Sequence, residues 1–241
     1  MTLLSAALLR GEAGLFHGFT ERRHGNIAFH VGDAPADVDA RHRKLAEAVG
    51  YPRDALVHMR QLHGNRVVVP EPGHGYRNPP ECDAVITDAP LRPLMVMVAD
   101  CTPVLLYDPG RRVIAAVHAG RAGAFRNIVG ACVSRMERDF GSDPAQILAV
   151  LGPSIRSCCY EVGEAICNEA MERGFAYATQ RRGGRCYLDV NAILRRQLKA
   201  SGVKEERIEL LPHCTCCEKE RFFSYRAERQ TGRFAGIIML K

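Results

Sequence analysis

Three side chains with metal-binding or nucleophilic chemistry stand next to short apolar runs in this chain: His63, Cys101 and His118. Cys101 lies between two such runs. His118 directly follows another run, and His63 lies in the turn segment after a further one. A rigid strand can aim a side chain at its end toward a fixed point. Two imidazoles and one thiolate are a zinc ligand set, and three protein ligands with an open fourth position are typical of catalytic zinc. These residues are therefore candidate ligands of a catalytic Zn²⁺ ion, although their spacing in the sequence does not show that they meet.

The same residues allow a second interpretation, in which Cys101 is a catalytic nucleophile and His118 or His63 is its general base. Asp100 is adjacent to this cysteine, and a nearby carboxylate raises the pKa of a thiol. A bound metal lowers that pKa instead. The neighbourhood therefore favours zinc over a free thiolate, and Cys101 is a candidate catalytic residue under both interpretations.

Two further segments have the residues to bind an anion. The glycine-rich stretch at 118–123 lies between a strand run and a helix, where backbone N–H groups at a helix N-terminus favour negative charge. Gly120 and Arg121 are candidate phosphate contacts there, although a simple tight turn explains the same glycines. Arg226, which follows Ser224 and Tyr225, is the other candidate, and its alternative is a solvated arginine at a strand end.

The chain contains ten cysteines. We expect no secretory signal, since no charged segment precedes an apolar stretch with a small-residue cleavage site. Reduced thiols, metal ligands or a nucleophile are therefore expected rather than a disulfide framework. Cys132 and Cys167 fall inside helical patterns and are expected to be small buried hydrophobes. Adjacent cysteines occur at 158–159 and in the Cys-Thr-Cys-Cys run at 214–217. Neighbouring side chains point to opposite sides of an extended chain, so these thiols are not expected to share one metal ion.

The apolar pattern predicts the elements that must position these residues. Continuous apolar runs predict buried strands, and apolar residues at spacings of three and four predict helices. Strands are predicted at 56–59, 66–69, 84–87, 94–98, 104–107, 113–117, 147–151, 208–211, 221–225 and 234–240, and helices from about 35 to 49, 125 to 140, 162 to 173 and 189 to 200. Strands and helices mix without strict alternation. This favours an α+β fold, with mixed β-sheets flanked by helices in a single domain over residues 1–241.

The composition excludes several classes of protein. Of the 241 residues, 46% are hydrophobic and 25% are charged, which is typical of a globular chain and not of a disordered or fibrous one. The longest apolar runs stop far short of the ~20 residues that span a membrane. The net charge of +6 is spread along the chain, without the dense basic footprint of a nucleic-acid binder. We expect a cytoplasmic protein with a small-molecule substrate and no nucleic-acid or membrane partner.

Motifs along nearly the whole chain resemble a family called laccase-domain, multicopper polyphenol oxidoreductase, YfiH-like or peptidoglycan editing factor. In chain order these motifs are His30-Val31-Gly32-Asp33, Gln61-Leu62-His63-Gly64, Asp83-Ala84-Val85-Ile86-Thr87, Ala99-Asp100-Cys101-Thr102-Pro103-Val104-Leu105-Leu106, His118-Ala119-Gly120, Gly152-Pro153-Ser154-Ile155, Tyr160-Glu161-Val162-Gly163, Cys214-Thr215, Phe223-Ser224-Tyr225-Arg226 and Thr231-Gly232-Arg233. The resemblance implies the family's Cys/His hydrolase-type α+β fold. It also implies a catalytic zinc on His63, Cys101 and His118. The copper label fits less well, because multicopper chemistry needs several His-rich clusters and the nine histidines here are scattered.

The resemblance implies an enzyme of purine nucleosides. Members of the family are described as zinc-dependent purine nucleoside phosphorylases that split adenosine, inosine and methylthioadenosine with phosphate and also deaminate adenosine. Applied to this chain, that chemistry makes Glu161 and Asp100 candidate proton carriers, and Gly120, Arg121 and Arg226 candidate phosphate ligands. The alternatives are a zinc hydrolase that edits peptidoglycan precursors, the Cys101–His118 hydrolase described above, and a binding protein without catalysis.

Two departures from the family pattern concern the predicted anion pocket. The family's turn usually reads His-Ala-Gly-Trp-Arg-Gly, whereas Arg121 and Ala122 stand in place of the tryptophan and arginine here. The family also usually has a second arginine after Ser-Tyr-Arg, where this chain has Ala227. Both departures bear on the substrate and leave the predicted metal ligands intact.

Overall fold

The computed structural model describes residues 1–241 and mixes strands with helices along the chain. The strands are β1 (Leu15–Phe19), β2 (Val67–Val68), β3 (Ala84–Thr87), β4 (Leu94–Val98), β5 (Thr102–Asp108), β6 (Val113–Ala119), β7 (Leu148–Leu151), β8 (Glu161–Val162), β9 (Thr179–Arg182), β10 (Arg185–Leu188), β11 (Ile208–Leu210) and β12 (Phe234–Leu240). The α-helices are α1 (Pro35–Val49), α2 (Arg121–Phe125), α3 (Ile128–Phe140), α4 (Glu164–Glu172), α5 (Val190–Ala200) and α6 (Tyr225–Glu228). Short 3-10 helices lie at Arg22–His24, Arg53–Ala55, Pro144–Gln146, Ala176–Ala178 and Glu205–Arg207.

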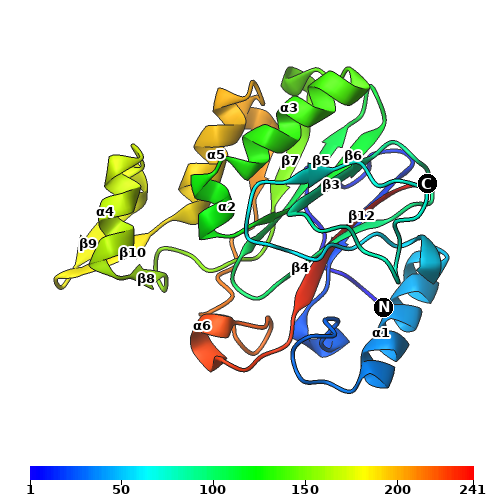
Figure 1. The fold of residues 1–241 in the computed structure, drawn as a ribbon, viewed down its shortest axis with the longest axis horizontal. Helices are drawn as coiled ribbons and strands as arrows, with labels where there is room; N and C mark the ends of the chain where they lie inside the picture. Colours follow the sequence, from blue (N-terminus) through cyan, green and yellow to red (C-terminus); the bar gives the residue numbers. More distant parts are fainter.

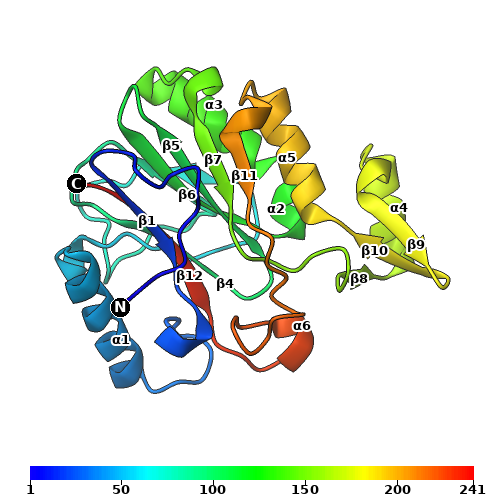
Figure 2. The same cartoon turned by 180° about the vertical axis from the view of Figure 1, so that it is seen from behind.

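Two β-sheets pack face to face at the centre of the molecule (Figure 1). The larger sheet has the strand order β11-β7-β5-β6-β3-β2, in which the outermost pair at each end is parallel and the other pairs are antiparallel. The smaller sheet, β1-β12-β4, is antiparallel. Helices α3 and α5 cover the outer face of the larger sheet, and α1 packs on the outer side of the smaller one (Figure 2). The predicted α+β fold of mixed sheets flanked by helices is confirmed.

The layered packing explains the continuous apolar runs of the sequence. Along β5, Val104 and Leu106 face the core beneath α3 and α5, while Leu105 and Tyr107 face the core between the sheets. Successive side chains of a strand alternate between its two faces. A strand that is covered on both faces is therefore apolar throughout, as β4 and β5 are.

The predicted helices at 35–49 and 189–200 are confirmed, and local hydrogen bonds explain their ends. Gly50 ends α1 in the left-handed conformation (φ +84°), and the Asp189 carboxylate caps α5 by accepting the Ala192 N–H at 3.0 Å. The predicted helix at 125–140 is broken at Asn127, which has φ +58° and caps α3 with its side chain. An asparagine can bond its own backbone in this way and so compete with the helix. None of the helices is long and apolar enough to cross a membrane.

Two of the predicted strands were wrong. The segment at 56–59 makes only an isolated β-bridge at Val57, and the segment at 221–225 bends into α6. Ser224 causes that bend, because its hydroxyl accepts the Ala227 N–H and donates to Asp100. The predicted strand at 66–69 shortens to β2, while β6 extends through His118, which therefore lies inside a strand.

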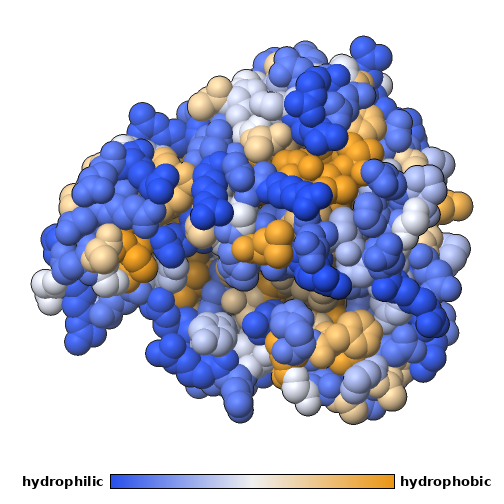
Figure 3. Space-filling model, in the orientation of Figure 1, coloured by the Kyte–Doolittle hydropathy of each residue, from blue (hydrophilic) through white to orange (hydrophobic).

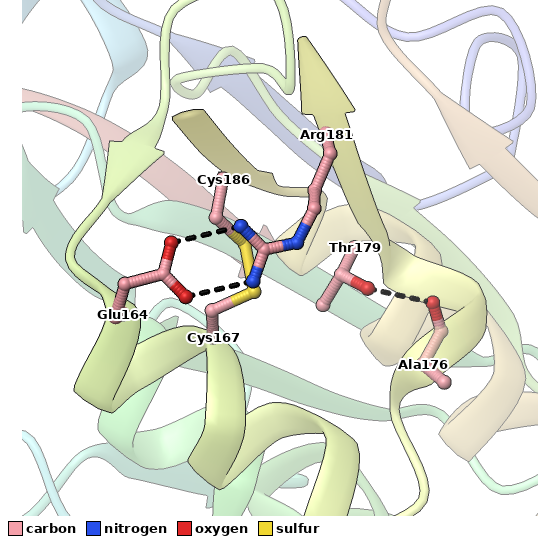
Figure 4. The surroundings of a disulfide bond; sticks show 6 residues. All are labelled: Glu164, Cys167, Ala176, Thr179, Arg181 and Cys186. Carbon is pink, nitrogen blue, oxygen red and sulfur yellow. Dashed lines mark hydrogen bonds and ion pairs between the residues drawn. A yellow bond between two sulfur atoms is a disulfide. The ribbon is translucent and has the colours of Figure 1, made fainter. Parts of the chain in front are cut away.

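A small unit built from α4, β8, β9 and β10 projects from the two-sheet body (Figure 1). Cys167 of α4 forms a disulfide with Cys186 of β10 there, and the Arg181 guanidinium donates to both oxygens of Glu164, at 2.8 and 2.7 Å (Figure 4). The expectation that Cys167 is an unpaired hydrophobe was therefore wrong. Helical spacing placed Cys167 on a buried face, but it could not show that a second buried cysteine lies opposite. Cys132 is free and buried, as expected.

Candidate functional site

His63, Cys101 and His118 lie together where the two central sheets meet. Their ligand atoms are within 4.8 Å of one another, and the two imidazole rings are perpendicular, with centroids 4.7 Å apart. His63 lies in the turn before β2, Cys101 lies in the connection from β4 to β5, and His118 lies in β6. Zinc binds nitrogen at about 2.0–2.1 Å and sulfur at about 2.3 Å. Three ligand atoms with this spacing therefore fit around one ion.

The backbone is unusual at two positions of this group. His63 has φ +59°, and Asp100, directly before Cys101, has φ +86°. A residue other than glycine in this region costs on the order of 1–3 kcal/mol, and such residues cluster at active sites. The surrounding hydrogen bonds must hold both residues in place.

A single buried carboxylate, Asp83, positions both histidines. Its Oδ1 accepts from His118 Nδ1 at 2.8 Å and from the His63 N–H at 2.9 Å, and its Oδ2 accepts from the Gly64 N–H at 2.7 Å. With Nδ1 engaged in this way, His118 is left with Nε2 to bind a ligand. Metal-binding histidines commonly have such a carboxylate partner. Sequence reasoning gave Asp83 no role, although its place directly before a buried strand, beside a predicted site, was a usable signal.

Electrostatic attraction between Cys101 and the two histidines favours the thiolate form of Cys101 and the protonated form of His118. Burial acts to raise the pKa of the Cys101 thiol, but His118 and His63 lower that pKa to about 6. Burial acts to lower the pKa of His118, but Cys101 and Asp83 raise that pKa to about 9. A thiolate at neutral pH is the form of cysteine that binds a metal or attacks a carbon.

Gly120 provides the space for the Cys101 sulfur. A Cβ built on this glycine would lie 2.8 Å from Cys101 Sγ and 3.5 Å from His63 Cδ2. Its φ of −79° is accessible to any residue, so the requirement for glycine here is one of space. Gly120 was predicted as a phosphate contact. The structure places it against the sulfur, at the N-cap of α2.

Asp100 lines the large cavity beside Cys101, but its carboxylate is fully engaged. Oδ1 accepts from the hydroxyls of Thr215 and Ser224, both at 2.7 Å, and Oδ2 accepts the Arg226 N–H at 2.6 Å. These bonds tie the strained Asp100–Cys101 backbone to the loop at Thr215 and to the start of α6. The arrangement suits a positioning role, and its predicted role in proton transfer stays a prediction.

A cavity of about 750 Å³ opens beside the three predicted ligands. Figure 3 shows a largely hydrophilic face with a hollow near its middle, where hydrophobic groups are visible. Aromatic, thioether and cationic side chains share its lining: Phe29, Tyr160, Tyr225, Met59, Met97, Arg226, Arg229 and Arg233. A cavity of this size and mixed polarity fits a small organic ligand that carries an anionic group.

The two predicted arginines lie in different places. Arg226 lines the large cavity, donates to the carbonyl of Glu161 at 2.8 Å, and lies over the Tyr160 ring with its guanidinium carbon 5.0 Å from the ring centroid. Arg121 lines a separate pocket of about 50 Å³ behind Cys101, where it pairs with Glu169 at 3.3 Å. Arg226 thus faces the larger space available to a substrate.

The Glu161 carboxylate lies away from the cavity lining. It contacts Arg185 at 3.2 Å and the Tyr187 hydroxyl at 3.4 Å in the projecting unit, while only its backbone carbonyl meets Arg226. The structure therefore does not bring this predicted proton carrier to Cys101. Its catalytic role stays a prediction.

Residues 16–241 match the family described as multi-copper polyphenol oxidoreductase laccase. The chain belongs to this laccase family. Among its laccase-family relatives, a purine nucleoside phosphorylase of Corynebacterium glutamicum is 39% identical over 216 residues, covering 89% of this chain and 86% of that protein. One of Streptomyces coelicolor is 39% identical over 236 residues, covering 94% and 96%. The crystal structure of the Bacillus licheniformis hypothetical protein YfiH superposes with a TM-score of 0.89 at 31% identity, over 94% of this chain and 93% of that one.

The predicted resemblance to the laccase-domain, YfiH-like family is confirmed. This laccase-family site brings two imidazole nitrogens and one sulfur within 4.8 Å of one another, a set that could hold a metal ion. Its second group of potential ligands contains sulfur alone. Neither group is a cluster of histidines of the kind that several coupled copper ions require.

Proposed function

We propose that this laccase-family chain is a zinc-dependent purine nucleoside phosphorylase that acts on adenosine, inosine and methylthioadenosine and also deaminates adenosine. The observation that carries the proposal is the convergence of His63, Cys101 and His118 beside the 750 Å³ cavity. The names of the relatives from C. glutamicum and S. coelicolor support the phosphorylase activity.

The donor set fits zinc. His63 and His118 would supply nitrogen and Cys101 would supply a thiolate, which is the three-ligand set typical of catalytic zinc. A zinc ion bound there supplies a Lewis acid that polarises an oxygen or ring nitrogen of the substrate. Asp83 fixes the tautomer of His118 by accepting from Nδ1 and keeps the His63 turn in place.

The cavity lining suits a nucleoside and a phosphate together. The rings of Phe29, Tyr160 and Tyr225 offer flat surfaces on which a purine can stack. Arg226 and Arg233 lie on the same lining and would hold phosphate oxygens by charge-assisted hydrogen bonds. Aromatic surface and positive charge in one cavity therefore support a purine nucleoside and phosphate as substrates.

Two reactions can share this cavity. In phosphorolysis a phosphate oxygen bonds to the ribose C1′, the bond from C1′ to the purine N9 breaks, and the leaving purine takes up a proton. In deamination water adds at purine C6 and ammonia leaves. Each reaction needs a proton carrier, for which Asp100 and Glu161 are the candidates from the sequence.

Product analysis tests the proposal. The zinc-loaded protein is incubated with adenosine, with and without phosphate, and the products are separated by liquid chromatography. Phosphate-dependent release of adenine and ribose 1-phosphate is expected, together with inosine from deamination. His63→Ala should abolish both reactions, whereas His74→Ala, a histidine outside the cavity lining, should leave them unchanged. Inosine as the sole product would refute the phosphorylase half.

One observation favours a second candidate function, a cysteine hydrolase. Cys101, His118 and Asp83 form a chain of nucleophile, base and orienting carboxylate, with 2.8 Å between His118 Nδ1 and Asp83 Oδ1. This order of groups is the one that activates a nucleophile in acyl transfer. Chelation separates the two functions, because removing zinc should abolish phosphorolysis but expose Cys101 to alkylation and leave a thiol hydrolase active.

A further inference from the structure

A second group of sulfur ligands lies outside the cavity. Cys158 and Cys159, in the turn between β7 and β8, meet Cys214 and Cys217, in the loop that follows β11. The four Sγ atoms lie within 4.8 Å of one another. None of these cysteines lines the cavity, and the proposed reactions use none of them.

Three of the distances between these sulfurs are close to the edge of a tetrahedron around one metal ion. Cys158 Sγ lies 3.5 Å from Cys214 Sγ and 3.7 Å from Cys217 Sγ, and Cys159 Sγ lies 3.3 Å from Cys217 Sγ. With Zn–S bonds of about 2.3 Å, tetrahedral ligands are about 3.8 Å apart. Disulfides would join the sulfurs in separate pairs, whereas Cys158 and Cys217 each have two sulfur neighbours.

The local backbone explains how adjacent cysteines reach the same point. The N–H groups of Cys159 and Tyr160 both donate to the Arg156 carbonyl at 2.9 Å, so the chain turns tightly here. The expectation that neighbouring cysteines point apart holds for extended chain and was wrong for this turn. Cys214 and Cys217 have the two-residue spacing that is common in structural zinc sites.

Backbone N–H groups also point at the Cys214 sulfur. They belong to Arg156, in the turn that precedes Cys158, and to Cys217 itself. Hydrogen bonds of this kind compensate negative charge on a sulfur ligand and join the two segments that carry the four cysteines.

We propose that Cys158, Cys159, Cys214 and Cys217 bind one structural Zn²⁺ ion, distinct from the proposed catalytic ion. Four thiolates complete the tetrahedral coordination and leave no position for substrate, as in other closed zinc sites. Each thiol gives up its proton when the ion binds, so the occupancy of the site falls as the pH decreases.

The proposed ion would fasten two loops, of which the first contributes Ile155 and Tyr160 to the cavity lining and the second contacts Asp100. The Cys159 carbonyl accepts from the Arg226 guanidinium at 3.2 Å, and Thr215, next to Cys214, donates to Asp100 at 2.7 Å. A single β-bridge, from Ser154 to Cys214, joins the loops in addition. Zinc at this point would therefore stabilise Arg226 and Asp100 in place without contacting substrate.

Zinc counting tests the proposal. The full chain and its variants are produced in zinc-supplemented medium and desalted in the presence of a reducing agent. The number of zinc ions per chain is then measured by elemental mass spectrometry. Wild type should hold two zinc ions. Cys158→Ser and Cys217→Ser should each lose one, whereas Cys216→Ser, which removes a neighbouring cysteine outside the group, should keep both. His63→Ala should lose the other ion.

The result that overturns the proposal is equal zinc content in Cys158→Ser and Cys216→Ser. Peptide mapping that locates a disulfide between two of the four cysteines, in protein purified without a reducing agent, would overturn it as well. Failure of the catalytic site is distinguishable, because it would make His63→Ala equal to wild type while Cys158→Ser still loses zinc. If the serine variants do not fold, cobalt-substituted His63→Ala protein provides the test: thiolate-to-cobalt absorption from four sulfurs is expected, and its absence refutes the site.

Discussion

At the scale of single residues, the site depends on two aspartates whose carboxylates position different parts of the chain. Asp83 is fully buried and holds His118 and the turn of His63, whereas Asp100 holds the loop at Thr215 and the start of α6. The three predicted ligands could be named from the sequence, because imidazole and thiolate chemistry is a property of the residue type. The positioning role of Asp83 could not be predicted from the sequence, because it depends on which turn the folded chain places beside this carboxylate.

Replacing Asp83 with asparagine should weaken metal binding at the His63–Cys101–His118 site. The amide keeps the size of the carboxylate but loses its charge, and it cannot accept from both His118 and the Gly64 N–H. A loss of on the order of 10- to 100-fold in zinc affinity is expected, as for other partners of metal-binding histidines. Competition with a chromophoric chelator measures the affinity. Asp88→Asn, an exposed aspartate nearby, should match wild type, and equal affinities in the two variants would argue against the role given to Asp83.

Gly120→Ala should damage the same site while leaving the fold intact. The new Cβ would lie 2.8 Å from Cys101 Sγ, so the sulfur must move out of the group. Gly163→Ala is a matched control, because Gly163 is also the N-cap of a helix (φ −69°) and its Cβ would meet nothing within 4 Å. Both variants should lose about 1 kcal/mol of stability or less at the cap. Only Gly120→Ala should lose zinc affinity, on the order of tenfold or more, and similar losses in both would count against a spatial role for Gly120.

At the scale of elements, strands buried on both faces could be predicted closely, and elements shaped by side-chain hydrogen bonds could not. The predicted strands 84–87 and 94–98 match β3 and β4, because a covered strand must be apolar throughout. Asn127 broke a predicted helix, and Ser224 bent a predicted strand. In both cases one polar side chain bonds nearby backbone, which an apolar pattern does not record. The four-cysteine group was missed for a related reason, since it depends on a turn.

The buried His42 of helix α1 should make the free energy of unfolding depend on pH. This residue is 1% exposed, its Nε2 lies 2.9 Å from the Ile27 carbonyl, and burial lowers its pKa to about 4. Between pH 6.5 and 4 the unfolded chain binds a proton at His42 that the folded chain does not. The free energy of unfolding therefore falls as the pH decreases through this window, by about 2 to 3 kcal/mol at pH 4.5 relative to pH 7.

Urea unfolding at pH 7 and pH 4.5 measures this dependence. His42→Gln keeps a hydrogen-bond donor but cannot be protonated, so its stability should fall less between the two pH values than that of wild type. His74→Ala, which removes a histidine outside the core, should keep the wild-type dependence. The same fall in wild type and His42→Gln would show that other groups cause it.

At the scale of the whole molecule, the site lies where the two central sheets meet. Cys101 is in the connection from β4, in the smaller sheet, to β5, in the larger one, and His118 is in β6 beside β5. Ligands from distant parts of the sequence meet because this topology brings strand ends together. The α+β class and the membership of the laccase family could be predicted from the sequence. The order of the layers and the projecting unit of α4, β8, β9 and β10 could be seen only in the structure. Both depend on which apolar faces of sheets and helices pack against each other.

The proposed catalytic zinc is tested most directly by anomalous X-ray diffraction from crystals of the zinc-loaded protein, recorded on both sides of the zinc absorption edge. A difference peak is expected between His63, Cys101 and His118, at about 2.0–2.1 Å from an imidazole nitrogen of each histidine and about 2.3 Å from Cys101 Sγ. An empty position at that point, or a peak that does not change across the zinc edge, would contradict a catalytic zinc centre.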